Sequence, residues 1–331
     1  MAVLVARPEN RDDFVTSAPS VAIITPTWAG DLEHFRLMRC SIEQSPLAAL
    51  PHYVVVQDED LPLFEEFRSR QGLTLLSTKE VLPEAVELRR AGARMLADRF
   101  GRNVTRICGS LKRVLGWPKW PSYTGWHTQQ LCKLKLASEL PFETAVVLDS
   151  DVVVTRSAAI TDFIAPAATV CFAEWEARQV LKGKVRNWVT ESEALVGAGQ
   201  IEDRANIYFD TPFVFDRNIL SQALKHLEGA GSKPWWQVLL DRPPRRWSEF
   251  GYYKAFLMYH AGDNQIEWRE PDFFRYVYDT SSPEAVVSEV TAMLDEHEVH
   301  YITIHSQASG REDWDAAAYL NPLALVIGSD R

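Results

Sequence analysis

The stretch AVVLDSDVVVT (residues 145–155) places two aspartates, Asp149 and Asp151, in a run of small and β-branched apolar residues. Such a run predicts a strand that is buried on both faces of a parallel sheet. Buried carboxylates are costly unless they are paired or bind a cation. Because residues two apart in a strand point to the same face, we expect both carboxylates to project together. Oxygen ligands of this kind suit Mg²⁺ or Mn²⁺.

The pair also has a plain structural interpretation, in which the strand ends here and both acids face solvent. In open α/β sheets, functional sites lie at the carboxyl ends of the strands. If Asp149 marks the end of strand pairing, Asp151 begins the sheet edge. The two interpretations therefore place the acids in the same region.

The first part of the chain alternates between strand-like and helix-like segments. Strands are expected at VAIITPT (21–27), HYVVVQ (52–57) and LTLLS (73–77). Helices are expected after each, beginning at the potential cap Asp31, at residues 58–70 and at residues 84–99. A further helix, WHTQQLCKLKLASEL (126–140), leads into the aspartate strand. This order predicts an α/β fold with a mostly parallel central sheet flanked by helices.

The second half is less regular. Strands are predicted at 169–176, 206–216, 266–270 and 299–307, and helices at 234–241, 247–260 and 282–298. No repeat or composition break divides the chain, so residues 1–331 are expected to form a single domain. Residues 101–125 interrupt the alternation with a basic segment rich in Gly, Pro and Trp, whose role is left open.

Composition restricts the class of protein. The 331 residues carry 45 acids and 35 bases, a formal charge of -10, which argues against non-specific nucleic-acid binding. The four cysteines are scattered without a Cys-x-x-Cys pair, as is typical of reduced thiols in a cytosolic protein. No stretch has the length of a signal peptide or membrane span. We therefore expect a cytoplasmic protein, with peripheral contact to the inner face of the membrane left open, as is the oligomeric state.

The segment TAVVLDSDVVVT (144–155) resembles the metal-binding Asp-x-Asp motif of the GT-A-fold glycosyltransferases. The preceding helix and turn (126–143) are also similar to the elements that introduce this motif in several bacterial families of that fold. The resemblance covers about residues 18–310. It implies a Rossmann-like GT-A fold with a nucleotide-binding half (18–155) and an acceptor-binding half (156–331). It further implies transfer of a sugar from a nucleotide-diphosphate donor to a saccharide acceptor, of the bacterial surface-polysaccharide type.

In such enzymes a Mn²⁺ or Mg²⁺ ion stabilises the charge that develops on the leaving diphosphate. The resemblance assigns Asp149 and Asp151 to this metal, with Asp149 also near the ribose. His305 is the candidate third ligand, although a lone histidine on a strand is often structural. The remaining donor contacts implied are Thr25, Thr27, Asp58, Gln129 and Lys133. Each of these five residues also has an ordinary interpretation as a strand-end, turn or solvated helix residue. Further candidates for contact with the diphosphate are Lys112, Arg113, Lys182, Lys184 and Arg186.

On the acceptor side, Glu249 resembles the general base that inverting GT-A enzymes carry near the start of a helix. An acid in the first turn of a helix is also favoured by the helix dipole, and a retaining enzyme needs no such base. Inversion is slightly favoured. The resemblance assigns donor-sugar or acceptor contacts to Asn206, Asp210 and Thr211. Trp247 could stack on a sugar, as could Trp235 and Trp236, with core packing as the alternative.

Two rival functions fit the same acids. One is a metal-dependent nucleotidyltransferase or phosphohydrolase, and the other is a non-catalytic saccharide-binding protein on the same fold. No Gly-rich phosphate loop is present, and no Asp-x-Asp follows the first strand, which disfavours the common phosphohydrolase classes.

Overall fold

The computed structural model describes residues 20–101, 107, 111, 114–115, 125–199, 201–243, 245–262, 265–278, 281–305 and 314–328. Most of the 101–125 segment, including Lys112 and Arg113, lies outside these residues, so its predicted role is not addressed.

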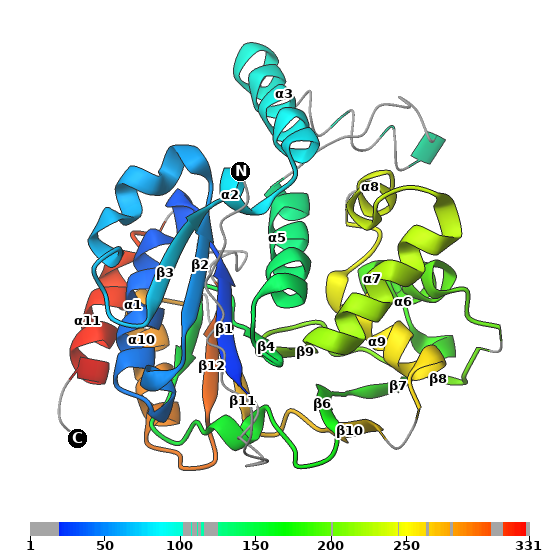
Figure 1. Cartoon of the computed structure of the whole chain (residues 1–331). Helices are drawn as coiled ribbons and strands as arrows, with labels where there is room; N and C mark the ends of the chain where they lie inside the picture. Colours follow the sequence, from blue (N-terminus) through cyan, green and yellow to red (C-terminus); the bar gives the residue numbers. More distant parts are fainter. Residues whose placement is uncertain are drawn as a thin grey trace, which may run out of the picture.

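A five-stranded sheet with the order β3-β2-β1-β4-β9 forms the centre of the fold (Figure 1). Its strands are β1 (Val21–Pro26), β2 (His52–Val56), β3 (Leu73–Ser77), β4 (Thr144–Val147) and β9 (Phe213–Asp216). The first four are parallel, and only β9 runs antiparallel, against β4. The α/β class with a mostly parallel central sheet is therefore confirmed.

The described residues also form three smaller sheets. In the first, β12 (Tyr301–Ile304) pairs in parallel with β11 (Phe274–Val277) and antiparallel with β5 (Val152–Val154). In the others, β6 (Thr169–Phe172) pairs in parallel with β10 (Ile266–Arg269), and β7 (Trp175–Ala177) antiparallel with β8 (Arg204–Asn206). The predicted strand 169–176 is thus divided between two sheets. The predicted strand 206–216 is a loop over most of its length, and only its end forms β9.

The helices cover the sheets in groups (Figure 1). On one side α11 (Ala317–Gly328) packs against α1 (Leu32–Glu43) and α10 (Pro283–Leu294). Beyond the other side of the sheet, α5 (Gly125–Glu139) lies against β1 and contacts α7 (Arg217–Gly231) and α9 (Glu249–His260), and α9 packs against α6 (Gly183–Val196). Further helices in the described part of the chain are α2 (Thr78–Val81), α3 (Glu84–Phe100) and α8 (Trp235–Leu240).

Several local features differ from the sequence-based expectation. The predicted helix 58–70 is a 3-10 helix over Asp58–Phe67 with Pro62 inside it, and proline disrupts α-helical hydrogen bonding. Asp31 makes no side-chain capping bond to α1, because its carboxylate accepts a hydrogen bond from Trp28 Nε1 (2.7 Å). The helices α6, α7 and α11 were not predicted. In α7 the signal was present, since Asp216 caps the helix and accepts from the amide of Ile219 (2.9 Å).

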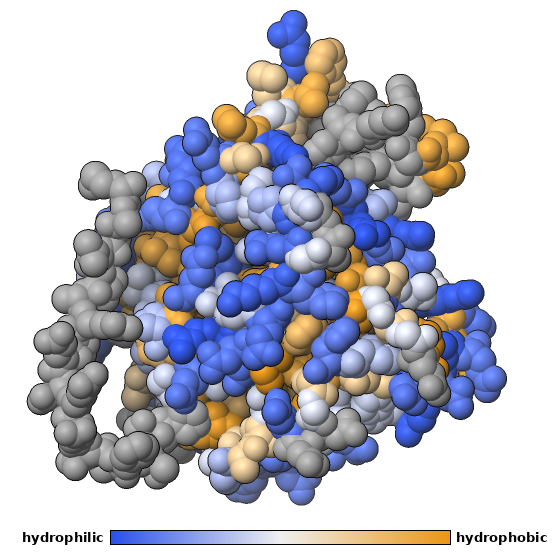
Figure 2. All heavy atoms as spheres, turned by 45° about the vertical axis from the view of Figure 1, so that its right-hand side comes forward, coloured by the Kyte–Doolittle hydropathy of each residue, from blue (hydrophilic) through white to orange (hydrophobic). Residues whose placement is uncertain are grey.

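One large apolar cluster extends across both halves, from β1 and α1 to β9, α9 and Tyr301. The face seen in Figure 2 is mostly hydrophilic, and apolar side chains gather there at the projecting helix α3. The exposed apolar residues of this helix are Leu88, Met95, Leu96 and Phe100. Within the described part of the chain, none of the helices combines the length and the apolar character that crossing a membrane requires.

Gly251 allows α9 to approach α6 closely, and this provides a test of the packing. A Cβ at this position would lie 2.6 Å from Ser192 Oγ and 2.9 Å from Phe209 Cε1. We expect Gly251→Ala to lower the free energy of unfolding by about 1–3 kcal/mol, measured by denaturant titration. Gly92→Ala in α3 is the matched control, because a Cβ there meets no atom within 4 Å. It should stabilise the protein by about 0.5–1 kcal/mol. Equal effects of the two variants would contradict this packing.

Candidate functional site

The two aspartates lie in a turn between two sheets. β4 ends at Val147, and the carbonyl of Asp149 accepts a hydrogen bond from the amide of Val152 (3.1 Å), where β5 begins. β4 belongs to the central sheet and β5 to the sheet of β11 and β12. The predicted continuous strand is therefore wrong, and strand parity does not orient the carboxylates. Their location at the carboxyl end of β4 agrees with the expected location of a site.

A buried lysine on α5 contacts the first aspartate. Lys133 Nζ lies 2.9 Å from Asp149 Oδ1 and 3.3 Å from Glu249 Oε1. Lys133 and Glu249 are 3% and 2% exposed, whereas the Asp149 side chain is 44% exposed. Burial acts to lower the pKa of Lys133, but the charges of the two acids outweigh it and raise this pKa above its ordinary value. A charged ammonium therefore lies directly behind an exposed carboxylate.

Glu249 begins α9 and is enclosed by side chains. Ser248, the N-cap residue, donates from Oγ to Glu249 Oε2 (3.3 Å). Gln130 donates its amide to the same carboxylate in the orientation in which its oxygen accepts from Trp126 Nε1. Burial raises the pKa of Glu249, and the charge of Lys133 opposes this rise. The carboxylate is buried in this conformation, and the general-base role predicted for Glu249 stays a prediction.

The loop between β8 and β9 contacts the acidic turn. The amide of Asp149 donates to Thr211 Oγ1 (3.3 Å), so Thr211 braces the main chain of the turn. Asp210 is exposed, yet the protein around its carboxyl raises its pKa. The positive charge of His305 opposes this rise, and the negative charge of Asp149 adds to it. Asp210 is therefore an accessible carboxyl close to the turn.

Asn206, also predicted to contact substrate, is buried and has a structural role. Its side-chain amide donates to the carbonyl of Phe172 (2.9 Å), and its side-chain oxygen accepts from the amide of Tyr208 (3.0 Å). These bonds shape the loop that carries Asp210.

His305 follows β12 and stacks on Tyr278, with ring centroids 4.2 Å apart. Burial raises the pKa of Tyr278, and the charges of Asp210 and Asp151 raise it further. These electrostatic interactions place His305, Tyr278, Asp151 and Asp210 around the same region. The structure thus brings predicted donor and acceptor residues together from elements far apart in the sequence.

The predicted metal ligands do not form a metal site as they lie. In the described ranges no group of three or more His, Cys, Asp or Glu side chains is arranged to hold a metal ion. Asp149, Asp151 and His305 offer suitable ligand atoms. However, Lys133 already contacts Asp149 Oδ1. This ligand set stays a prediction.

A pocket of about 460 Å³ opens at the carboxyl ends of β1 and β2. Its lining includes Thr27 and Gln129, two of the predicted nucleotide contacts, together with Gln57. Gln129 lies one turn before Lys133 on α5, so this helix connects the pocket to the acidic turn. Other residues that line the pocket are Trp28, Asp31, Thr78, Trp126 and Arg245.

Two predicted nucleotide contacts lie elsewhere. Thr25 is buried, and its hydroxyl hydrogen-bonds His52 Nε2 (2.9 Å). Burial lowers the pKa of His52 to about 3, with the charge of Arg39 adding to the shift, so this imidazole is neutral. Asp58 forms an ion pair with Lys79 and does not line the pocket. Strand-end and turn positions alone did not distinguish these side chains from Thr27.

Trp247 is fully buried and packs edge-on against Trp126, with ring centroids 4.9 Å apart. It has no exposed face for a sugar in this structure, so the predicted stacking is replaced by core packing. Trp235 and Trp236 are partly buried against the same core. Among the basic candidates, Lys184 has an electrostatic effect on Asp210 and lies over the ring of Trp188 (4.2 Å).

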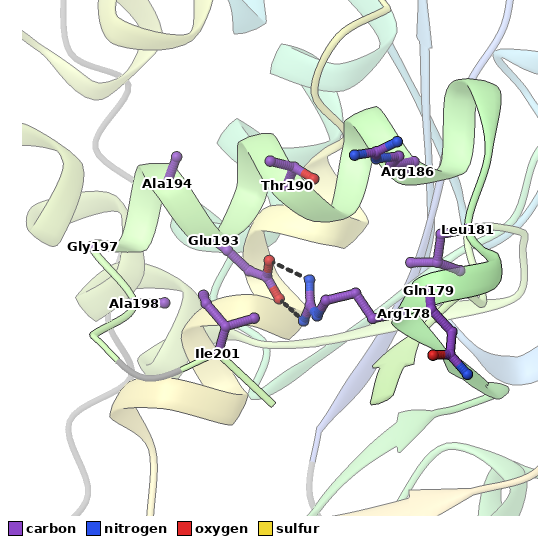
Figure 3. Close-up of a pocket in the computed structure, with 10 residues that line it drawn as sticks. All are labelled: Arg178, Gln179, Leu181, Arg186, Thr190, Glu193, Ala194, Gly197, Ala198 and Ile201. Carbon is purple, nitrogen blue, oxygen red and sulfur yellow. Dashed lines mark hydrogen bonds and ion pairs between the residues drawn. The ribbon is translucent and has the colours of Figure 1, made fainter. Parts of the chain in front are cut away.

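Another hollow, of about 800 Å³, lies along α6 (Figure 3). Arg178 and Glu193 join across it through two hydrogen bonds of 2.8 and 2.5 Å. Of the predicted donor contacts, only Arg186 lines it, and neither acid of the turn does. Its size alone does not make it the site.

Two residues of interest were missed by the sequence analysis. Arg245 lines the pocket at β1 and β2 and has a positive φ of 62°, a conformation that is uncommon for non-glycine residues. Lys254 is a buried lysine that lies between Tyr253 and Ala255 in the largely apolar and aromatic middle of helix α9. A lone lysine among aromatic residues was the available signal, because a buried charge needs partners.

Comparison with known proteins identifies a family and a set of similar structures. The model of a family of unknown function, DUF6492, matches residues 21–324. No curated protein matches the chain.

Solved structures similar to this chain include glycosyltransferases. Mouse xyloside xylosyltransferase 1 is 13% identical, with a TM-score of 0.43, and the match covers 87% of this chain and 98% of that one. The galactosyltransferase LgtC, solved with donor and acceptor sugar analogues, is 11% identical with a TM-score of 0.44, covering 94% and 97%. Core-mannan synthase A from Aspergillus fumigatus, in a Mn/GDP form, is 10% identical with a TM-score of 0.42, covering 80% and 79%. Likenesses at this level assign neither a substrate nor a residue role.

The buried ion pair of α5 and α9 makes a testable prediction. Lys133→Met removes one partner and leaves Glu249 uncompensated in the interior, so we expect a loss of about 3–5 kcal/mol in the free energy of unfolding. Lys135→Met is the control, because Lys135 pairs with Glu139 at the surface of the same helix, and its loss should cost less than about 1 kcal/mol. Adding Glu249→Gln to Lys133→Met should recover part of the loss in a double-mutant cycle. Additive effects would contradict the pairing.

Proposed function

The chain belongs to the DUF6492 family, whose function is unknown, and we propose from its own site that it is a glycosyltransferase that uses a nucleotide-diphosphate sugar. The observation that carries the proposal is the convergence of Lys133, Asp149 and Asp210 beside the pocket at the carboxyl ends of β1 and β2. Sugar transfer needs a nucleoside pocket, control of charge at the diphosphate, and carboxyl groups that face the sugar.

In this proposal the nucleoside occupies the pocket lined by Thr27, Gln57 and Gln129, where hydroxyl and amide groups supply donors and acceptors. A pocket of about 460 Å³ falls within the range of small-molecule sites. The diphosphate then extends along α5 toward Asp149. Arg245, on the pocket wall, supplies a guanidinium that suits phosphate oxygens. Lys133 reduces the negative charge that Asp149 presents to the diphosphate.

The acceptor is a saccharide, whose hydroxyl must lose a proton as it attacks the anomeric carbon. Asp210 is the better candidate for contact with this hydroxyl, because it is exposed and its pKa is raised. Glu249 is enclosed and supports Lys133. A surface-polysaccharide acceptor rests on the motif resemblance.

Metal dependence is kept as a prediction from the Asp-x-Asp resemblance. A bound Mn²⁺ or Mg²⁺ would supply Lewis-acid stabilisation of the diphosphate. The residues as they lie do not close around an ion, so the roles given above involve the side chains alone.

A nucleotide-sugar screen tests the proposal. We expect one UDP- or GDP-sugar to be hydrolysed slowly without acceptor, and the matching nucleoside diphosphate to bind in calorimetry. Asp149→Asn and Asp151→Asn should each weaken nucleotide binding at least tenfold if the resemblance to the metal motif holds, and EDTA should do the same. Absence of nucleotide binding for every donor, with and without Mn²⁺, would refute the transferase. Hydrolysis of nucleotides that carry no sugar would favour the phosphohydrolase.

Two conservative variants separate the roles of the carboxyl groups. Asp210→Asn should lower kcat by about 10²–10⁴-fold while leaving nucleoside diphosphate affinity within about twofold, the effect expected for a group that moves a proton. Glu249→Gln should mainly lower stability, because it removes a charge that supports Lys133. If Asp210→Asn keeps a near-normal kcat and a folded Glu249→Gln loses it, the general base is Glu249 and not Asp210.

A further inference from the structure

A second buried lysine, Lys254 on α9, organises the loop between β8 and β9. Its ammonium donates to the carbonyl of Asn206 (3.1 Å), to Asn206 Oδ1 (3.0 Å) and to the carbonyl of Tyr208. The same nitrogen lies 4.0 Å from the centroid of the Phe209 ring. Lys254 is buried, so these contacts are made away from solvent.

The three acceptors match the three N–H groups of an ammonium, and a neutral amine still donates to two of them. Two of the acceptors are main-chain carbonyls, that of Asn206 at the end of β8 and that of Tyr208 in the segment 207–212, which forms no sheet pairing. Without the lysine the buried Tyr208 carbonyl would lose this donor, which is unfavourable. The conformation of the loop therefore depends on Lys254.

The loop leads directly to the acidic turn. After Phe209 come the exposed Asp210 and then Thr211, whose hydroxyl accepts from the amide of Asp149. Tyr208 fixes the far end of the loop, because its hydroxyl donates to the carbonyl of Pro212 (2.9 Å). The same loop is thus attached to α9 at one end and to the turn of Asp149 at the other.

We propose that Lys254 is a positioning residue that holds Asp210 and Thr211 against the Asp149 turn. It contacts neither donor nor acceptor and acts through the main chain of the loop. The part of the inference that concerns turnover rests on the proposed function, whereas the control of loop conformation does not.

The surroundings of Lys254 make this control sensitive to pH. The groups that face it are Cys171 from β6, Glu174 after β6, and Asp210 from the loop, and Glu193 of α6 lines the same small cavity. Burial lowers the pKa of Lys254 to about 7, although these three neighbours oppose the shift. When the loop opens, the amine reaches water and its pKa returns toward 10.5. The closed loop therefore gains stability as pH rises from about 7 toward 10.5, and loses it as pH falls through 7.

Hydrogen exchange of the intact protein, followed by mass spectrometry and corrected for intrinsic rates, tests this inference. In the wild-type chain, protection of the amides of residues 206–211 should increase more than about tenfold between pH 7 and 9.5. Lys254→Met should lower this protection at least tenfold and remove its pH dependence. Lys225→Met, at an exposed position on α7, should match the wild type. Unchanged protection in a folded Lys254→Met, or a flat profile in the wild type, would overturn the proposal.

A third variant separates the two ends of the loop. Thr211→Val should increase exchange at the Asp149 amide while keeping residues 206–209 protected, because Lys254 is intact. If the Asp149 amide stays protected, the loop does not brace the turn, and the proposal fails at that step.

The activity measurement follows once the screen has supplied a donor. Lys254→Met should lower kcat at least tenfold, through the displaced Asp210, and leave nucleoside diphosphate affinity within about twofold. If Lys254→Met loses protection of the loop in hydrogen exchange but keeps the wild-type kcat, the inferred effect of Lys254 on turnover is wrong. A screen that finds no donor would refute the proposed function, and the exchange experiment would still decide the role of Lys254.

Discussion

The ion pair of Lys133 with Asp149 and Glu249 is the interaction on which the candidate site depends. Burying an ammonium and a carboxylate is unfavourable unless they find each other and further hydrogen bonds. The requirement is met only when α5, the end of β4 and the start of α9 lie in their observed positions. The ion pair therefore contributes mainly by favouring this one arrangement of α5, β4 and α9 over others. It also determines which acid is presented outward, since Asp149 is exposed and Glu249 is enclosed.

The proposed role of a second lysine, Lys254, concerns the main chain of the same aspartate, Asp149. Lys133 contacts the side chain of Asp149, whereas Lys254 reaches its main chain through the loop and Thr211. Both lysines are linked to α9, one through Glu249 in its first turn and the other by belonging to the helix. This makes α9 the element that carries the site, and it explains why Gly251, between these two positions, must leave room for α6.

The strands of the central sheet were predictable because each is a short apolar run with little ambiguity, as in VAIITP and HYVVV. The turn at Asp149 was placed inside a strand because apolar residues continue on both sides, and only pairing with β12 shows that Val152 belongs to another sheet. Of the candidate site, Thr27, Gln129 and Lys133 were singled out by their positions at a strand end and on the helix before the acidic turn. Asp149 and Asp210 were singled out by resemblance, and the roles of all five stay predictions. The enclosure of Glu249 and the contacts of Lys254 depend on residues more than forty positions away, which no local pattern specifies.

The turn of Asp149 and Asp151 has a mechanical consequence, because it is the covalent link between β4 and β5 and these strands belong to different sheets. A ligand that contacts both carboxylates would bind at the junction of the two sheets and hold them in one relative position. Any small slide of one sheet past the other would in turn change the spacing of the two acids. The affinity for such a ligand and the free energy of moving one sheet relative to the other are therefore coupled. Substitutions between β5 and β12 would change the affinity although the substituted residues do not contact the ligand.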